Sequence, residues 1–253
     1  MEGDFEMTVR QTLSHARRDA LLLVRRKRDA KTYKRFKNMT LGTVDELVGG
    51  HFETWAESLH PNRKGFEAVL REDFGRPLRI VETGTSAWGT DSTRLWDSYV
   101  SRFGGEFWSV DISSLPSRRL NSQVGNRTHL VVQDSVEFLE GFAVLGSGAL
   151  INLCYLDSWD LDWNDPHPAA IHGLAEWNAL LPMLGAGSKV LIDDTPTDIS
   201  WVPENYRDQA LVYEAEFGTL PGKGALILRE IEEKSLPVKY LWRGYNVALQ
   251  IEL

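Results

Sequence analysis

After residue 76, short apolar runs alternate with longer amphipathic stretches, and this pattern predicts alternating strands and helices. Apolar runs of about four to eight residues are typical of buried strands, whereas apolar positions three and four residues apart are typical of helices. The run 149–156 is almost wholly apolar, as expected for a central parallel strand covered on both faces. The predicted strands are 78–82, 106–111, 130–133, 149–156, 189–192, 238–242 and 247–251, and the predicted helices are 92–103, 136–145, 168–184 and 222–234.

This order of elements predicts an α/β fold with a doubly wound, mostly parallel sheet of seven strands and right-handed crossovers. The last two strands lie close together around Gly244, so we expect an antiparallel last strand. Residues 1–75 are predicted to form a helical N-terminal extension. Within it, 8–37 lacks Gly and Pro and carries an apolar stripe, and Thr43 is a candidate N-cap for a short helix.

Charge is distributed unevenly along the chain. The 253 residues include 36 acidic and 28 basic ones, a formal net charge of −8, yet ten Lys and Arg side chains fall within 17–37. This basic arm is open to three interpretations: a solvated helix face, a lid or homodimer element, or a phosphate-binding surface. Tyr33 and Phe36 are its only aromatic residues and offer no base-stacking platform. We therefore do not expect a nucleic-acid partner.

Cysteine content and hydropathy suggest the compartment. Cys154 is the only cysteine, so the chain can form neither an intrachain disulfide nor a cysteine-based zinc site. No apolar run reaches the length of a membrane span, and the first residues lack the basic-then-apolar order of a signal peptide. The expected localisation is cytoplasmic, without membrane contact.

The first predicted strand ends in Glu82 and is followed by a loop containing Gly84 and Gly89. In open α/β sheets, ligands bind beyond the carboxyl ends of the strands. The two glycines are five residues apart, which excludes the dinucleotide fingerprint, and no Gly-Lys-Ser/Thr follows, which excludes a P-loop. The charge of Glu82 disfavours a pyrophosphate and suits a ligand with a cationic amine.

The second and third strands deliver further polar groups to the same edge. Asp111 is well placed to accept two hydrogen bonds from a ribose diol. Asp134 and Ser135 form a short polar pair that suits an adenine amino group. Together these positions predict a nucleoside site.

Three carboxylates follow the fourth and fifth strands: Asp157, Asp193 and Asp194. No Lys or Arg stands beside them in the sequence, so they should repel one another if desolvated. A divalent cation such as magnesium would resolve that repulsion. The alternative is that one or two of these strand-end acids only cap helices or bind backbone N–H groups.

The ordered set of strand ends resembles the class I S-adenosylmethionine-dependent methyltransferases, in particular the metal-dependent macrocin and catechol O-methyltransferase branch. Val81-Glu82-Thr83-Gly84-Thr85, Val110-Asp111, Gln133-Asp134-Ser135, Leu156-Asp157 and Ile192-Asp193-Asp194 carry the resemblance, which covers about 76–253. It implies that 76–253 is a Rossmann-like domain binding S-adenosylmethionine and Mg²⁺. The implied cofactor contacts are Glu82, Gly84, Thr85, Ser86, Gly89, Ser92, Asp111, Ile112, Asp134, Ser135 and Asp157.

The sequence also departs from that family. Trp88 stands where a small residue is usual, and the cofactor loop is longer by about one residue. No Lys closely follows Asp157, so a catechol-type lysine base is not evident. The acceptors of the family vary widely, and the sequence therefore predicts only a hydroxylated small molecule or sugar.

The resulting mechanistic hypothesis is methyl transfer to an acceptor oxygen. A metal held by Asp157, Asp193 and Asp194 would lower the pKa of the acceptor hydroxyl. Asp160 is the predicted proton acceptor, with His167 and His172 as rivals. The candidate acceptor wall contains Trp159 and Trp163, the loop 195–206 is a candidate cover, and Trp177 and Trp242 are expected in the core.

Two other functions fit parts of the pattern. A nucleotide-dependent oxidoreductase would also place an acid after the second strand. A non-catalytic adenosyl-binding protein would keep Glu82 and Asp111 but bind no metal.

Overall fold

The computed structural model describes residues 30–56, 58–85, 90–144 and 150–252. All seven predicted strands are present, as β1 (Leu78–Thr83), β2 (Gly105–Asp111), β3 (Thr128–Val132), β4 (Leu153–Leu156), β5 (Lys189–Ile192), β6 (Val238–Arg243) and β7 (Val247–Ile251). They form one sheet in the order β3-β2-β1-β4-β5-β7-β6. Strands β1 to β5 pair in parallel, and β7 is antiparallel to both β5 and β6. The predicted fold class is confirmed.

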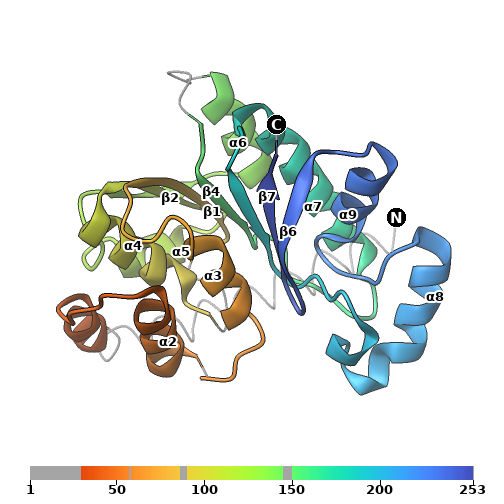
Figure 1. The fold of residues 1–253 in the computed structure, drawn as a ribbon, viewed down its shortest axis with the longest axis horizontal. Coiled ribbons are helices and arrows are strands. Elements are labelled where there is room, and N and C mark those ends of the chain that lie inside the picture. Colours follow the sequence, from red (N-terminus) through yellow and green to blue (C-terminus); the bar gives the residue numbers. More distant parts are fainter. Residues whose placement is uncertain (1–29, 57, 86–89, 145–149, 253) are drawn as a thin grey trace.

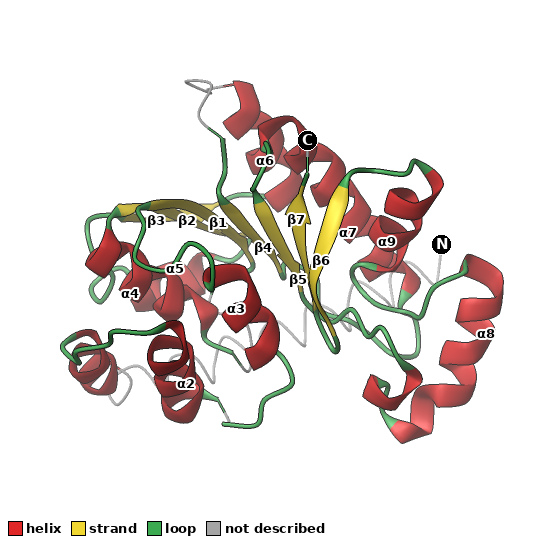
Figure 2. Ribbon diagram, viewed as in Figure 1, coloured by secondary structure: helices red, strands yellow, loops and turns green. Residues whose placement is uncertain are grey.

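Helices cover both faces of this sheet (Figures 1 and 2). One face carries α2 to α5, and the other carries α6, α7 and α9, while α8 lies to one side. Three short 3₁₀ turns follow β4 and β5, at Leu181–Met183, Ile199–Trp201 and Glu204–Tyr206. The α-helices are α2 (Val44–Trp55), α3 (Arg63–Leu70), α4 (Ser92–Phe103), α5 (Ser114–Leu120), α6 (Ser135–Val144), α7 (His167–Leu180), α8 (Arg207–Phe217) and α9 (Ala225–Glu233).

The alternation of side chains along the strands builds one apolar core on each face. On the α2–α5 face, Phe66 of α3 stacks on Trp96 of α4 with ring centroids 5.2 Å apart, and meets Tyr155 of β4 edge-on at 5.0 Å. On the other face, Trp177 of α7 is fully buried. Trp242 packs against the first core. The expectation that these two tryptophans are packing residues is confirmed.

The described part of the N-terminal extension belongs to the first core. Residues 30–37 are helical, and Tyr33 from this helix is buried and donates a hydrogen bond to the Asp97 carboxylate. Lys37 pairs with the same carboxylate at 2.8 Å. Thr43 caps α2 as predicted, in a capping box with Glu46. The rest of the predicted helix 8–37, with most of the basic arm, lies outside the described residues.

Two described helices were not predicted, and each lacks the usual apolar period. On α8 only Ala210 and Tyr213 are buried, whereas Leu211 and Val212 are exposed, so no apolar stripe marks it. Helix α5 is short and carries Pro116 in its first turn, where proline is tolerated. None of the helices in the described ranges has the length and apolar character needed to cross a lipid bilayer.

Candidate functional site

The predicted site residues follow strands that end at one edge of the sheet. In the parallel register Thr83 of β1 pairs with Val110 of β2 and with Leu156 of β4, which in turn pairs with Ile192 of β5. The residues after these positions therefore emerge side by side, because the carboxyl ends of parallel strands share an edge. The structure brings the loops after β1, β2, β4 and β5 together, as the sequence predicted.

Glu82 lies at the centre of a buried hydroxyl cluster. Its carboxylate accepts hydrogen bonds from Ser92 at 2.5 Å, from Thr93 at 2.6 Å and from Ser109 at 2.7 Å. Burial raises the pKa of Glu82 to about 7, although the three hydroxyls oppose that shift. Glu82 thus ties the first turn of α4 to β1 and β2, a bracing role that the sequence alone did not indicate.

The loop after β1 requires Gly84. This residue has φ of 90°, its N–H donates to the Val110 carbonyl at 2.7 Å, and a Cβ here would collide with the Asp157 carbonyl. Thr85 follows, and its N–H donates to Asp111 at 3.1 Å. The predicted contacts Ser86 and Gly89, and Trp88 with them, lie outside the described residues.

Asp111 and Ile112 form the rim after β2. The other oxygen of Asp111 accepts a 2.7 Å hydrogen bond from the backbone N–H of Ser113. These two backbone hydrogen bonds hold the carboxylate in one orientation. Ile112 is 72% exposed, which is unusual for an isoleucine and leaves an apolar surface beside the acid.

Asp134 and Ser135 mark the start of α6. One Asp134 oxygen accepts from the backbone N–H groups of Val136 at 2.9 Å and Glu137 at 3.1 Å, so this acid caps the helix. The Ser135 hydroxyl lies 3.1 Å from the His172 ring and faces the site.

His172 of α7 joins the third and fourth strand ends. Its Nε2 lies 2.9 Å from the Ser158 hydroxyl, and its ring lies 5.2 Å from that of Trp159. Burial would lower the pKa of His172, but the carboxylate of Glu176 one turn along α7 raises it above its ordinary value. A small hollow is lined by Leu156, Ser158, Trp159, Ala169, His172, Gly173, Glu176, Ile192 and Lys223.

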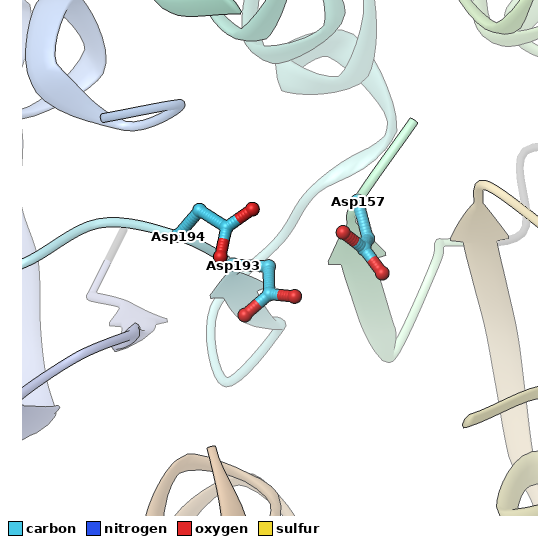
Figure 3. A group of neighbouring side chains, drawn as sticks. All are labelled: Asp157, Asp193 and Asp194. Carbon is cyan, nitrogen blue, oxygen red and sulfur yellow. The ribbon is translucent and has the colours of Figure 1, made fainter. Parts of the chain in front are cut away.

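The three predicted metal ligands do meet (Figure 3). Asp157 follows β4, Asp193 and Asp194 follow β5, and one carboxylate oxygen from each lies within 4.8 Å of the others. Asp194 has φ of 40°, in the left-handed region, which turns its side chain back toward the cluster. We call Asp157, Asp193 and Asp194 the acidic cluster.

Side chains from distant parts of the chain bind the acidic cluster. Asn62, just before α3, donates to Asp193 at 2.6 Å. Tyr155 of β4 donates to the second oxygen of Asp193 at 2.8 Å. Tyr245, between β6 and β7, donates to Asp194 at 2.8 Å. These contacts were missed because they join segments far apart in the sequence.

A lysine that the sequence did not predict also lies in the acidic cluster. The ammonium group of Lys223 hydrogen-bonds Asp157 and lies 3.2 Å from Asp194, and its side chain is 5% exposed. No basic residue adjoins these carboxylates in the sequence, but one does in space, so the expectation that they lie together without a compensating cation is wrong. The available signal is a lysine between two glycines, Gly222 and Gly224, at the start of the predicted helix 222–234.

The pKa values of Asp157, Asp193 and Lys223 all depart from their ordinary values. Burial raises the pKa of Asp157 to about 6, against the lowering effect of Lys223. It raises the pKa of Asp193 well above the ordinary value, and the neighbouring Asp157 and Asp194 add to the effect. Burial alone would lower the pKa of Lys223, but the facing carboxylates raise it well above its usual range. Lys223 is therefore a permanent cation at neutral pH.

The fit of a metal ion can be judged from the carboxylate oxygens. Both oxygens of Asp193 and both of Asp194 accept hydrogen bonds or an ion pair from the chain, and Lys223 binds one oxygen of Asp157. The second oxygen of Asp157 is buried and receives no such donor. The spacing of the three carboxylates suits a metal ion. A divalent ion needs several oxygen ligands, however, and only one of these six carboxylate oxygens is open.

The predicted proton acceptors lie in different surroundings. Asp160 is exposed in the loop after β4, three residues beyond Asp157. His167 begins α7, with Nδ1 3.2 Å from the Tyr213 hydroxyl and its ring stacked on Phe217 at 4.5 Å. These contacts tie His167 to α8.

The structure was compared with known proteins. No protein-family model matches the sequence, and no curated protein matches it either. Among solved structures, the chain resembles the methyltransferase MycE from the mycinamycin biosynthetic pathway, in complex with Mg, SAH and mycinamycin VI. The TM-score is 0.55 at 17% identity, over 83% of this chain. The chain has the methyltransferase fold.

Two further solved structures match with lower TM-scores. The O-methyltransferase TomG from Streptomyces achromogenes, in complex with SAM, has a TM-score of 0.47 and 15% identity over 85% of this chain and 92% of its own. An O-methyltransferase from Bacillus cereus, in complex with SAH, has a TM-score of 0.45 and 14% identity over 84% and 92%. The match to MycE spans 54% of the MycE chain.

Proposed function

We propose that this protein is an S-adenosylmethionine-dependent methyltransferase that methylates a hydroxyl oxygen of a small molecule. The observation that carries the proposal is the rim after β2. There Asp111 is fixed by the backbone N–H groups of Thr85 and Ser113, next to an exposed Ile112. A carboxylate held in this way can accept from a ribose diol, and the adjoining apolar surface suits the face of a base.

The other cofactor contacts follow from this placement. The adenine ring would extend from Ile112 toward Ser135, with Asp134 holding the start of α6 in position. The methionine part would reach the loop around Gly84 and Thr85, and Ser86 and Gly89 are further proposed contacts in this loop. Glu82 and Ser92 would shape this loop through the buried hydroxyl cluster, and Asp157 would close it from the side of β4.

Acceptor binding belongs to the loops after β4 and β5. Trp159 is 36% exposed beside the small hollow, so it can provide an apolar wall. The sulfonium methyl is already activated, and the protein must align it with the acceptor oxygen and exclude water. Asp160 is the proposed proton acceptor, and His167 and His172 are its rivals. A cytoplasmic location and a dimer through the N-terminal helices stay predictions.

The magnesium ion that the sequence predicts is a hypothesis apart from this proposal, because most of the carboxylate oxygens that would hold it are already bound. Asp157, Asp193 and Asp194 would hold it through carboxylate oxygens, and a bound ion would lower the pKa of the acceptor hydroxyl. The Mg in the MycE complex supports such an ion. The ammonium of Lys223, bound to two of the three carboxylates, argues against it.

Calorimetry on the full chain tests the proposal. Wild-type protein should bind S-adenosylmethionine or S-adenosylhomocysteine, and Asp111→Ala should weaken binding at least about thirtyfold, the cost of two charged hydrogen bonds. Asp208→Ala, which removes an exposed acid from the first turn of α8, is the matched control and should bind like wild type. Absence of binding by wild type would refute the proposal.

Two further measurements separate the alternatives. Quenching of protein fluorescence by NADH, without binding of an adenosyl sulfonium, would favour the oxidoreductase. Tight cofactor binding without methyl transfer to any compound of a hydroxylated library would favour a non-catalytic adenosyl-binding protein.

A further inference from the structure

The strongest feature that the proposed function does not use is Lys223. It lies in the loop between α8 and α9, 66 residues along the chain from Asp157. Its side chain is almost wholly buried and contacts the acidic cluster. Along the chain Lys223 follows the three acids, whereas Asn62, which also binds the cluster, precedes them. A buried lysine is costly unless it is paired, so this placement needs an explanation.

The backbone around Lys223 is built to hold it there. The N–H of Lys223 donates to the carbonyl of Asp194 at 3.0 Å, and the N–H of Gly224 donates to the Thr195 hydroxyl at 2.9 Å. A Cβ at Gly222 would collide with the same Asp194 carbonyl, so only glycine permits this approach. The loop of the lysine is thus fastened to the loop that carries two of the acids.

We propose that the ammonium group of Lys223 is the resident cation of the acidic cluster and that it excludes a divalent ion from Asp157 and Asp194. Magnesium binds carboxylate oxygens at about 2.1 Å. An ion at that distance from the Asp194 oxygen that faces Lys223 would lie within about 5 Å of the ammonium nitrogen, in a buried site where like charges repel strongly.

Of the other carboxylate oxygens of the cluster, only the second oxygen of Asp157 is open, and a single oxygen does not make a magnesium site. Asn62 and Tyr155 donate hydrogen bonds to the two oxygens of Asp193. Tyr245 donates to the Asp194 oxygen that does not face Lys223. Hydrogen bonds from an ammonium, an amide and two phenols already stabilise most of the carboxylate oxygens. A hydrated dication would have to break several of these contacts at once.

Lys223 is accordingly a positioning residue: it fixes the side chains of Asp157 and Asp194 at the ends of β4 and β5. This inference goes beyond the proposed methyl transfer and does not depend on it. It concerns only which cation the cluster holds, and that can be measured without a cofactor or an acceptor.

The test is direct binding of Mn²⁺, a paramagnetic probe for magnesium sites, to the full chain. Free Mn²⁺ is counted by its electron paramagnetic resonance signal. We expect wild type to bind no Mn²⁺ at a free concentration of about 1 mM. Lys223→Met should bind one ion with a dissociation constant of about 100 µM or less, at least about tenfold below that concentration. Lys223→Arg keeps the positive charge and should behave like wild type.

Lys189 provides the matched control. It is also a buried lysine, paired with Asp73 at the other end of β5, and Lys189→Met should gain no Mn²⁺ site. Circular dichroism checks that each variant is folded. If Lys223→Met does not fold, the wild-type titration decides: one Mn²⁺ bound below about 100 µM overturns the proposal, and none at about 1 mM supports it.

A folded Lys223→Met variant that gains no site would also overturn the proposal. Calorimetry with S-adenosylmethionine on the same samples keeps this outcome distinct from the proposed function. Absence of S-adenosylmethionine binding by wild type would refute the proposed methyltransferase function and leave the conclusion about the cation unchanged.

Discussion

The carboxyl group of Glu82 gives the sharpest quantitative prediction, because it is fully buried and its pKa lies far from the ordinary value. The perturbation is Glu82→Gln, which keeps the shape of the side chain and removes its titration. The amide oxygen can still accept from one or two of the hydroxyls of Ser92, Thr93 and Ser109. Any difference in pH dependence between the two proteins then comes chiefly from this one group.

The direction follows from the raised pKa. The native pKa of about 7 exceeds the value of 4.5 expected for an unfolded chain, so the unfolded chain loses the Glu82 proton first as the pH rises. The stabilisation is therefore complete below the unfolded pKa and is lost as the pH rises through 7. Between pH 5 and pH 8 the loss is about 2.5 kcal/mol.

The assay is urea unfolding of wild type and Glu82→Gln at several pH values from about 5 to 8. The free energy of unfolding of wild type, relative to the variant, should fall by about 2.5 kcal/mol over this range. Glu67→Gln is the control. Burial would raise the pKa of Glu67, but Lys64 and Arg63 lower it below 4.5, so its stabilisation is lost only as the pH falls below this range.

A constant difference between wild type and Glu82→Gln across the whole range would refute the reasoning. It would mean that Glu82 is already ionised at the acidic end, and that three hydroxyl donors outweigh the cost of burying the charge. A difference that grows with pH would contradict the sign of the shift.

Two further predictions concern the core and the cofactor loop. Phe66→Ala should lower the free energy of unfolding by about 3–5 kcal/mol, because it empties the space between Trp96 and Tyr155; a loss below about 1 kcal/mol in urea unfolding would contradict this packing. Gly84→Ala should weaken S-adenosylmethionine binding in calorimetry by at least about tenfold, since the new Cβ collides with the Asp157 carbonyl. Gly141→Ala in α6, where a Cβ meets open space, should bind like wild type; equal affinities in all three proteins would show that the loop does not need its glycine.

Local patterns predicted the elements whose burial is periodic. Strands β5 and β7 and helix α4 have the predicted bounds, because their apolar positions start and stop at polar or glycine residues. The predicted strand 149–156 was too long: Leu150 is exposed and Asn152 precedes the β4 ladder. Apolar content alone does not say where strand pairing begins.

The site was predictable as far as strand topology determines it. Asp157, Asp193 and Asp194 meet because β4 and β5 are parallel neighbours, and the order of strands along the chain implies that pairing. Asn62 and Lys223 were not predictable in the same way. They reach the cluster from loops outside the sheet, and no local period records which loop packs on which strand end.

The hydrogen bond from Asn62 to Asp193 has a consequence for engineering the protein. It joins the helical extension to the carboxyl end of β5. The side chain of Asn246, which lies 184 residues further along the chain, donates a 3.0 Å hydrogen bond to the Asn62 carbonyl. The described part of the extension, from residue 30 on, is therefore not an interchangeable module. A chimaera that grafts another protein's extension onto this sheet must bring an amide to the same place, or the carboxylate of Asp193 at the end of β5 loses a hydrogen-bond donor.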